Sequence, residues 1–198
     1  MKEKIIFFDD VHPYIIEYLR GLGFECMEHF NTDYEEILKV VKDADGLVGR
    51  SRFQLDRSFL SFCSKLKFIA RYGVGTDHID LEYANQRGIE VITSPEGSAD
   101  TVAEHTVGMI LSVLNNLQRA DRQVREGKWL RESNRGIEIK YKTIGILGYG
   151  NMASAVAKRL RGFQSKVIAF DKYKPNYGDE FAKEVGLEEF FRETDILS

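Results

Sequence analysis

Short apolar runs alternate with amphipathic segments through the first half of the chain, and this alternation predicts a parallel α/β fold. Strands are predicted at residues 4–9, 24–28, 45–51, 66–72 and 89–92. Helical spacing of apolar residues predicts helices between them at residues 13–19, 33–42, 55–62 and 81–87. Runs of Ile, Leu, Val and Phe are typical of strands buried on both faces, and strands that alternate with helices favour a parallel sheet.

A long helical pattern follows this first half. Residues 95–100 have the composition of a linker that ends in a helix cap at Asp100, and the helix is predicted to continue to about Glu126. Its predicted apolar side consists of Val102, Thr106, Met109, Ile110, Val113, Leu114 and Leu117. Helices of globular proteins average about 10–14 residues, so a helix of this length is expected to bridge two domains or to support a dimer interface.

A strand-turn-helix-strand pattern over residues 143–171 contains the clearest chemistry of the sequence. An apolar strand at 143–147 leads into the turn GYGNMA, which starts at Gly148. Gly148 permits a tight turn, Gly150 leaves room for a pyrophosphate, and the small Ala153 lets helix and strand pack closely. The helix N-terminus would then present free N–H groups to the phosphates. An ordinary glycine turn is the alternative, but the strand, the helix and a following acid favour a dinucleotide-binding unit.

That acid is Asp171, which ends the second strand of the pattern. It follows the first glycine by about 20 residues, the spacing at which a carboxylate accepts hydrogen bonds from the ribose hydroxyls of the adenosine. A carboxylate in this position repels a 2′-phosphate, so the sequence predicts NAD as the cofactor in preference to NADP. Lys172 and Lys174 are close enough to weaken that preference.

Two further loops follow strands in the first half. Gly73 and Gly75, which flank Val74, let successive N–H groups point into one concavity that suits a carboxylate. A simple glycine turn is an equally good interpretation of this loop. Arg50 and Ser51 end another strand. The guanidinium of Arg50 could bind a second anionic group of a substrate, although a solvated arginine is the commoner case. Ligands of open α/β sheets bind outside the carboxyl ends of the strands, where both loops lie.

The composition is that of an ordinary soluble globular protein, with 198 residues, 43% hydrophobic residues, 30% charged residues and a net charge of −3. No basic block is present, so nucleic acid and anionic membranes are not predicted partners. No apolar run approaches the about 20 residues of a membrane span, and the apolar part of MKEKIIFFDD is too short for a signal peptide. The default prediction is a cytoplasmic protein.

Neither a metal site nor an acid–base pair is predicted. Cys26 and Cys63 are isolated thiols without metal-ligand or disulfide spacing. None of the four histidines lies at a spacing that compels pairing with a carboxylate. Glu104 and His105 are neighbours on a predicted helix and point about 100° apart. No catalytic residue is assigned on these grounds.

Five motifs, taken together and in order, resemble the D-isomer-specific 2-hydroxyacid dehydrogenases, and most of all their phosphoglycerate dehydrogenase branch. They are Arg50-Ser51, RYGVGTDHID, SPEGSADTVAEHTVGMIL, VREGKW, and IGILGYGNMASAVAKRLRGF with the following AFD. The resemblance implies an α/β protein with a flavodoxin-like substrate domain at residues 1–97 and a Rossmann NAD-binding domain at residues 98–198. It also implies a small anionic hydroxy-acid or keto-acid substrate, and a homodimer formed through the long helix and the arm with the Gly-x-Trp segment.

The resemblance further implies roles for individual residues. The backbone of Gly73, Val74 and Gly75 would bind the substrate carboxylate, with Val74 also near the nicotinamide. Arg50 and Ser51 would belong to the substrate site, and Arg50 would face the distal phosphate if the substrate is 3-phosphoglycerate. The cofactor-binding residues implied in this way are Val74, Thr106, Gly148, Gly150, Asn151, Met152, Ala153 and Asp171, with Asn151 and Met152 at the pyrophosphate.

Members of that family transfer hydride with an Arg, a Glu and a His, and all three are expected beyond Ser198. The sequence is therefore predicted to be an N-terminal fragment of an NAD-dependent oxidoreductase that acts on the CH–OH group of a 2-hydroxy acid, and to be inactive by itself. The alternative is a non-catalytic NAD-binding module related to the corepressor-type members of the family.

The last residues, 193–198, are predicted to form the first half of the third strand of the cofactor domain. A Rossmann sheet has the strand order 3-2-1-4-5-6, so only the first half of that domain is expected. The strand at 143–147 would then lie at an exposed edge, and an exposed apolar edge promotes aggregation.

Overall fold

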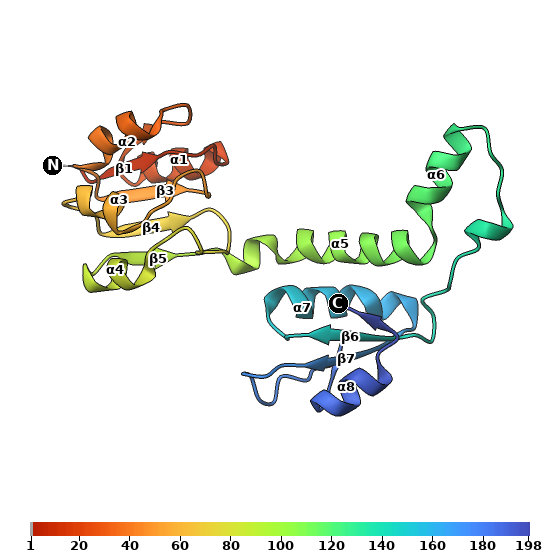
Figure 1. Ribbon diagram of the computed structural model, residues 1–198. Coiled ribbons are helices and arrows are strands. Elements are labelled where there is room, and N and C mark those ends of the chain that lie inside the picture. Colours follow the sequence, from red (N-terminus) through yellow and green to blue (C-terminus); the bar gives the residue numbers. More distant parts are fainter. Residues whose placement is uncertain (1) are drawn as a thin grey trace. The chain divides into compact units, whose positions relative to one another are not determined.

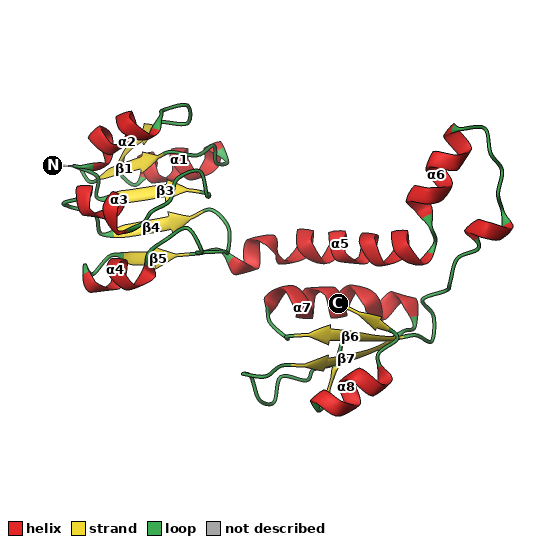
Figure 2. Ribbon diagram, in the orientation of Figure 1, coloured by secondary structure: helices red, strands yellow, loops and turns green. Residues whose placement is uncertain are grey.

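A computed structural model describes residues 2–198 (Figure 1). The chain divides into two compact units, Met1–Pro95 and Glu96–Ser198. Each unit contains a parallel β-sheet connected by helices (Figure 2). The predicted α/β class is therefore confirmed in both units.

The first unit has five parallel strands in the order β2-β1-β3-β4-β5 (Figure 1). This is the strand order of flavodoxin-like folds, which confirms the predicted architecture. The strands are β1 (Lys4–Phe7), β2 (Glu25–Glu28), β3 (Gly46–Gly49), β4 (Phe68–Arg71) and β5 (Glu90–Ile92). The helices are α1 (Pro13–Gly21), α2 (Tyr34–Val41), α3 (Arg57–Phe62) and α4 (Leu81–Gln86). Each of these elements lies within a few residues of its predicted position.

Alternate residues of β1 point to opposite faces of this sheet and belong to two apolar clusters. Ile5 and Phe7 pack in one cluster with Ile16 of α1. Ile6 packs in the other with Ile37 of α2. Full burial of such a side chain contributes roughly 1.5–3 kcal/mol to stability. Helices on both faces thus hold the strands in register and leave their carboxyl ends along one edge.

Three aspartates fix the starts of α2, α3 and α4. Asp33, Asp56 and Asp80 are N-cap residues, and each carboxylate accepts the backbone N–H three residues further on at 2.8–2.9 Å. A cap of this kind contributes about 1 kcal/mol. These helices therefore begin where the sequence supplies a short side chain with an acceptor oxygen.

The second unit begins with two helices where one was predicted. Helix α5 (Pro95–Leu114) starts before the expected cap at Asp100, since a proline has the backbone φ of a first helical turn. It ends at Leu114, and α6 (Leu117–Arg125) follows after Asn116, whose φ of 52° is left-handed. Asparagine tolerates this conformation better than most residues. The chain later returns to this point, where the N–H of Ile137 donates to the carbonyl of Leu114 at 2.9 Å.

The buried face of α5 also differs from the predicted one. The residues of α5 that pack in the core of the second unit are Ala103, Val107, Ile110 and Leu114. The prediction was right for Ile110 and Leu114. Of the other residues on the predicted apolar side, Val113 is 75% exposed. The helix has apolar residues on more than one side, and the sequence alone does not show which side meets the sheet.

The sheet of the second unit has the order β8-β7-β6-β9, and all its strands are parallel (Figure 1). The strands are β6 (Thr143–Leu147), β7 (Lys166–Phe170), β8 (Lys183–Glu184) and β9 (Ile196–Leu197). The helices between them are α7 (Asn151–Leu160) and α8 (Leu187–Glu193), and short 3-10 turns occur at Glu132–Asn134 and Arg161–Phe163. Numbered from β6, the order is 3-2-1-4, as in a Rossmann sheet.

The prediction for the last strand was wrong. Ile196 and Leu197 pair with Ile144 and Gly145 of β6, whereas the place beyond β7 is taken by β8. Strand β6 is thus an interior strand, and the expected exposed edge and its aggregation hazard do not exist there. The reason is that β8 has only two residues, Lys and Glu, and carries no apolar signal.

A glycine in β6 makes room for the segment that leads into β9. A side chain at Gly145 would overlap the side chain of Thr194 and would lie 3.0 Å from the ring of Phe190. The N–H of Thr143 also donates to the carboxylate of Asp195 at 2.8 Å. Close packing and this hydrogen bond hold β9 beside β6.

Candidate functional site

The turn between β6 and α7 has the geometry of a phosphate-binding turn. Gly148 has a φ of 84°, a left-handed conformation that favours glycine, and its N–H donates to the carbonyl of Phe170 at 2.7 Å. A Cβ added at Gly150 would meet nothing within 4 Å. Among the described residues, no side chain caps the N-terminus of α7. The first N–H groups of α7 thus lack helical partners and lie beside open space.

The carboxylate of Asp171 lies against this turn. One of its oxygens accepts the N–H of Tyr149 at 2.8 Å, and the other accepts the N–H groups of Tyr173 and Lys174 at 2.8 and 3.0 Å. The Tyr149 N–H is the main reason that the pKa of Asp171 lies below its ordinary value. A carboxylate has about four lone-pair sites, so these three bonds leave capacity for a hydroxyl group.

The two lysines after Asp171 point to different partners. The ammonium of Lys174 lies 3.4 Å from the carbonyl oxygen of Tyr149, at the glycine turn. The ammonium of Lys172 instead lies over the ring of Tyr173, 5.3 Å from its centroid. Lys174 is therefore the lysine that adds positive charge to the turn.

Tyr149 is a residue of this site that the sequence did not reveal. It is 2% exposed, and its hydroxyl donates to the carboxylate of Asp179 at 2.9 Å. Burial, and then the hydrogen bond with Asp179, raise the pKa of Tyr149 above its ordinary value. Its position between two glycines is variable in the fingerprint, and no signal in the sequence pointed to Asp179.

The remaining predicted cofactor residues of the second unit lie on two helices. Asn151 is exposed in the first turn of α7, while Met152 and Ala153 are partly buried, and Ala153 packs against the core. The hydroxyl of Thr106 donates to the carbonyl of Val102 within α5 at 2.8 Å. Contacts of Thr106, Asn151 and Met152 with a cofactor stay predictions.

In the first unit, the loop after β4 is partly closed by its own side chains. Gly73 has a φ of 143°, and its N–H donates to the carbonyl of Arg71 at 2.8 Å. The guanidinium of Arg71 donates to the carbonyl oxygens of Tyr72 and Gly75 at 2.5 and 2.9 Å. A carboxylate at this loop would therefore depend on the N–H groups of Val74 and Gly75 rather than on that of Gly73.

Arg50 lies beside this loop, because β3 and β4 are neighbours in the sheet. Its guanidinium lies over the ring of Tyr72, 5.1 Å from the centroid, and its backbone N–H donates to the carboxylate of Asp9 at 2.6 Å. Arg50 and Ser51 are both exposed. The structure thus brings the two loops predicted from sequence to one edge of the sheet.

Arg52 supports the same edge and was not predicted. Its guanidinium donates to the carbonyl of Phe8 at 3.0 Å and also to the carbonyls of Phe30 and Thr32. It also lies over the ring of Phe53. Because these carbonyls follow β1 and β2, one side chain joins the ends of two strands.

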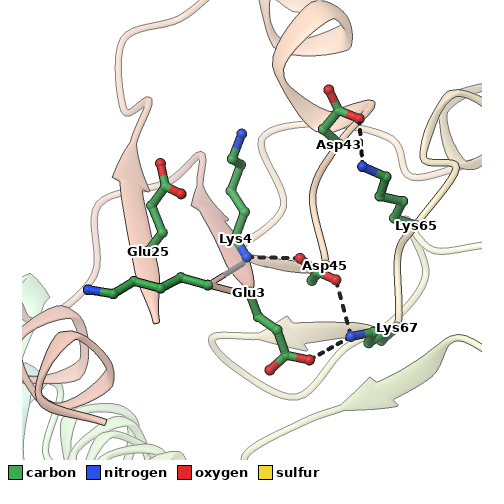
Figure 3. A pocket seen from close by; sticks show the side chains of 8 residues that line it. Glu3, Lys4, Glu25, Asp43, Asp45, Lys65 and Lys67 are labelled. Atoms are coloured by element: carbon green, nitrogen blue, oxygen red, sulfur yellow. Dashed lines mark hydrogen bonds and ion pairs between the residues drawn. The ribbon is translucent and has the colours of Figure 1, made fainter. Parts of the chain in front are cut away.

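A cavity of the first unit lies at the opposite edge of its sheet (Figure 3). It has a volume of about 790 Å³ and is lined by Lys2, Glu3, Lys4, Glu25, Asp43, Asp45, Lys65 and Lys67. Positive and negative side chains pair across it, as Lys65 does with Asp43 at 3.2 Å and Lys67 with Asp45 at 3.2 Å. These residues are at the amino ends of the strands, away from the edge where ligands of such sheets bind.

Histidines and cysteines of the described residues form no obvious reactive centre. Within residues 2–198, no group of three His, Cys, Asp or Glu could hold a metal ion. Cys63 is buried, which raises the pKa of its thiol to about 12. Nδ1 of His12 accepts the N–H of Tyr14, and Nδ1 of His29 is bonded to Thr32. Over the same residues, no helix is long and apolar enough to cross a membrane.

Comparison with known proteins decides the family. The family model described as "D-isomer specific 2-hydroxyacid dehydrogenase, catalytic domain" matches residues 5–194. The chain belongs to this family. Its parallel strands, its glycine turn and the following acid are therefore features of a D-isomer-specific 2-hydroxyacid dehydrogenase, as the motifs suggested.

Individual relatives agree with that assignment. The chain is 37% identical over 185 residues to the D-3-phosphoglycerate dehydrogenase of Methanocaldococcus jannaschii. This match covers 93% of the chain and 34% of the relative. It is 37% identical over 171 residues to the hydroxypyruvate reductase of Thermotoga maritima, covering 86% of this chain and 55% of the relative. The chain thus spans about a third of the length of its phosphoglycerate dehydrogenase relative.

A solved structure of the family has a similar fold. The D-lactate dehydrogenase of Aquifex aeolicus, crystallised with NAD and lactic acid, superimposes with a TM-score of 0.81 at 28% identity. The match covers 98% of this chain and 59% of that one. The structural likeness therefore extends over nearly all of the present 2-hydroxyacid dehydrogenase chain.

Proposed function

We propose that this chain forms the NAD-binding and substrate-carboxylate-binding parts of an NAD-dependent oxidoreductase that acts on the CH–OH group of a 2-hydroxy acid. One observation carries the proposal: the N–H of Tyr149, in the glycine turn, donates a hydrogen bond of 2.8 Å to the carboxylate of Asp171. A turn with free helical N–H groups suits a pyrophosphate, and an adjacent ionised acid suits a ribose. The second unit, predicted as residues 98–198, would bind the cofactor, and residues 1–97 the substrate.

The preference for NAD over NADP follows from the charge of Asp171. Its low pKa keeps the carboxylate ionised at neutral pH, where it would repel a 2′-phosphate. Lys174 lies close enough to the turn to offset part of that repulsion. The Aquifex aeolicus relative, which was crystallised with NAD, supports the same choice.

The proposed substrate is 3-phosphoglycerate. The N–H groups of Val74 and Gly75 would bind its carboxylate, and Arg50 with Ser51 would take the phosphate at the same edge. The guanidinium of Arg50 is held over the ring of Tyr72, 5.1 Å from its centroid, and Arg50 and Ser51 are both exposed at this edge. Phosphoglycerate dehydrogenases are among the relatives, which supports this choice, and a hydroxypyruvate reductase of the same identity makes a hydroxy acid without a phosphate the competing substrate.

Binding and turnover are separate parts of the proposal. Hydride transfer from a hydroxy acid to NAD requires a group that takes the hydroxyl proton. Within residues 2–198, no hydrogen bond joins a histidine to a carboxylate. We therefore expect the 198-residue chain to bind NAD without catalysing the reaction.

A cytoplasmic homodimer completes the proposal. Val113 is 75% exposed and Trp129 is 82% exposed, although both are apolar. Exposed apolar side chains of this size are common at interfaces between subunits. Sedimentation equilibrium of the chain should give the mass of a dimer, and a monomer at every concentration would contradict this part.

Calorimetric titration of the 198-residue chain tests the cofactor assignment. NAD and ADP should both bind, and NADP should bind about tenfold more weakly because of Asp171. A folded chain that takes up neither NAD nor ADP would overturn the proposal. In a parallel assay with NAD and 3-phosphoglycerate, NADH absorbance should not rise; a rise that persists after removal of host enzymes would refute the expected inactivity.

A further inference from the structure

Two tyrosines connect the glycine turn to the segment after Asp171. The ring of Tyr149 lies 5.6 Å from the ring of Tyr177, centroid to centroid. Both side chains are at most 6% exposed. Aromatic pairs at this distance contribute about 0.5–1.5 kcal/mol beyond the burial of their surface. The pair therefore packs the residue between the two glycines against the segment that follows Asp171.

Each hydroxyl of this pair has a specific partner. The Tyr177 hydroxyl donates to the carbonyl of Ala169 at 2.9 Å and accepts the N–H of Asp171 at 2.9 Å. The Tyr149 hydroxyl donates to the carboxylate of Asp179 at 2.9 Å. One tyrosine thus holds the backbone of Asp171, and the other attaches the glycine turn to Asp179.

Asp179 is itself fixed by the backbone around it. Its Oδ1 accepts the N–H groups of Phe181 and Ala182 at 2.8 and 3.1 Å, and its own N–H donates to the carbonyl of Ala182 at 3.1 Å. Such a turn gives the carboxylate one orientation. Tyr149 is therefore bound to a rigid acceptor.

The backbone of Tyr149 carries this constraint to the acid. Its N–H donates to Asp171 at 2.8 Å while its side chain is bonded to Asp179. A rotation of the Tyr149 peptide would break the bond to Asp171 and move the carboxylate. Hydrogen bonds that fix a binding group before the ligand arrives lower the entropic cost of binding.

We propose that Asp179 is a positioning residue for dinucleotide binding, which acts through the Tyr149 hydroxyl to hold Asp171 in the orientation that receives the ribose. The inference rests on the proposed function, since it assumes that Asp171 binds the ribose of NAD. It adds a residue outside the fingerprint, one that approaches the turn from the loop before β8.

The test uses Tyr149→Phe and Asp179→Asn in the 198-residue chain. Tyr149→Phe removes only the hydroxyl and keeps the ring against Tyr177. Tyr149→Phe should raise the Kd for NAD about three- to tenfold, the effect of losing one hydrogen bond. Asp179→Asn keeps a neutral amide beside the Tyr149 hydroxyl and should raise the Kd by a smaller factor, because a charge-assisted hydrogen bond becomes a neutral one. The double variant should bind NAD as weakly as Tyr149→Phe and no more weakly, because without the Tyr149 hydroxyl the side chain at position 179 has no bond to the glycine turn.

Two ligands distinguish positioning from a general loss of stability. ADP and 2′-deoxy-ADP differ by the hydroxyl that Asp171 is proposed to bind, so the ratio of their Kd values measures that contact. The ratio should be large for the unchanged chain and should fall in Tyr149→Phe and Asp179→Asn. A structural role alone would lower the melting temperature and leave the ratio intact, which would refute the inference.

Glu180→Gln provides the matched control. Glu180 is next to Asp179 in sequence, but it pairs with Arg161 at 3.1 Å on the surface. Exposed pairs of this kind contribute little, so both the Kd and the ratio should stay unchanged. If Asp179→Asn fails to fold, Tyr149→Phe decides the question. If the unchanged chain binds neither ADP nor NAD, the proposed function fails. If the unchanged chain prefers ADP to 2′-deoxy-ADP and the variants show the same preference, only the inference fails.

Discussion

The N–H of Tyr149, in the turn after β6, and the carboxylate of Asp171, just after β7, are joined by a hydrogen bond of 2.8 Å. The residue between the two glycines and the acid at the end of the next strand therefore form one structure before any ligand is present. A change at either position is expected to alter the other, and substitutions at this site need controls that separate binding from folding.

Asp171→Ala should weaken NAD binding about tenfold or more, since it removes the proposed ribose acceptor. It also removes the acceptor of three backbone N–H groups, so the melting temperature should fall. Asp171→Asn keeps an oxygen for these groups and loses only the charge. Calorimetry on both variants checks the assignment, which fails if the folded alanine variant binds NAD as well as the unchanged chain does.

Lys174→Ala should weaken NADP binding about two- to fivefold more than it weakens NAD binding, because a 2′-phosphate adds further negative charge near this ammonium. Lys172→Ala is the control, since Lys172 lies over Tyr173 and away from the turn. Titration of both variants with NAD and NADP gives the comparison. An equal loss of NADP affinity in the two variants would mean that Lys174 has no particular role.

Arg50→Gln should weaken binding of 3-phosphoglycerate about tenfold and should leave binding of glycerate unchanged. The reason is that Arg50 is proposed to bind the phosphate, which glycerate lacks. Calorimetry with both compounds measures the difference. If glycerate and 3-phosphoglycerate are affected equally, Arg50 serves the loop rather than the phosphate.

Asp45 should make stability depend on pH in the acid range. The N–H of Lys4, followed by Lys67, holds the pKa of this carboxyl below its ordinary value. A depressed pKa in the folded state contributes stability that is complete above the unfolded value of about 3.9 and is lost as the pH falls through the lower folded value. Urea midpoints of the unchanged chain and Asp45→Asn should differ most at neutral pH and converge as the pH falls below the folded pKa of Asp45. A constant difference would show that ionisation of Asp45 has no part in it.

Gly145→Ala should destabilise the second unit by about 1–3 kcal/mol, because the added methyl group overlaps the side chain of Thr194. Gly108→Ala on α5 is the control, since its methyl group would meet nothing within 4 Å. Helix propensity favours that change by roughly 0.5–1 kcal/mol. Thermal unfolding of both variants measures the difference, and equal stability would contradict the packing of β9 against β6.

The first unit could be predicted almost completely, because its central strands, β1 and β3, are buried apolar runs and the other strands alternate regularly with helices. The glycine turn could also be predicted, since only a glycine accepts the backbone of Gly148 without strain. Strand β8 could not, because Lys183 and Glu184 form a strand only through pairing with β7. The last residues, which form β9 beside β6, were therefore assigned to the place that β8 occupies.

Long-range hydrogen bonds were the other part that sequence could not supply. Tyr149 and Asp179 are 30 positions apart, and nothing in their local composition connects them. Arg52 likewise depends on carbonyls of two distant loops. Such contacts follow from the packed fold, whereas a glycine fingerprint follows from local backbone geometry alone.

The bond between the Ile137 N–H and the Leu114 carbonyl has a consequence for how this chain tolerates change. Residues 115–136 leave the end of α5 and return to the same point, so they form a long loop whose two ends are held together by this hydrogen bond. A loop of this kind can be lengthened, shortened or exchanged for a foreign segment without shifting α5 or β6, because closure entropy grows slowly with loop length. Because residues 115–136 also carry Trp129, a change there is expected to alter the proposed dimer and to leave the fold of the two sheets intact.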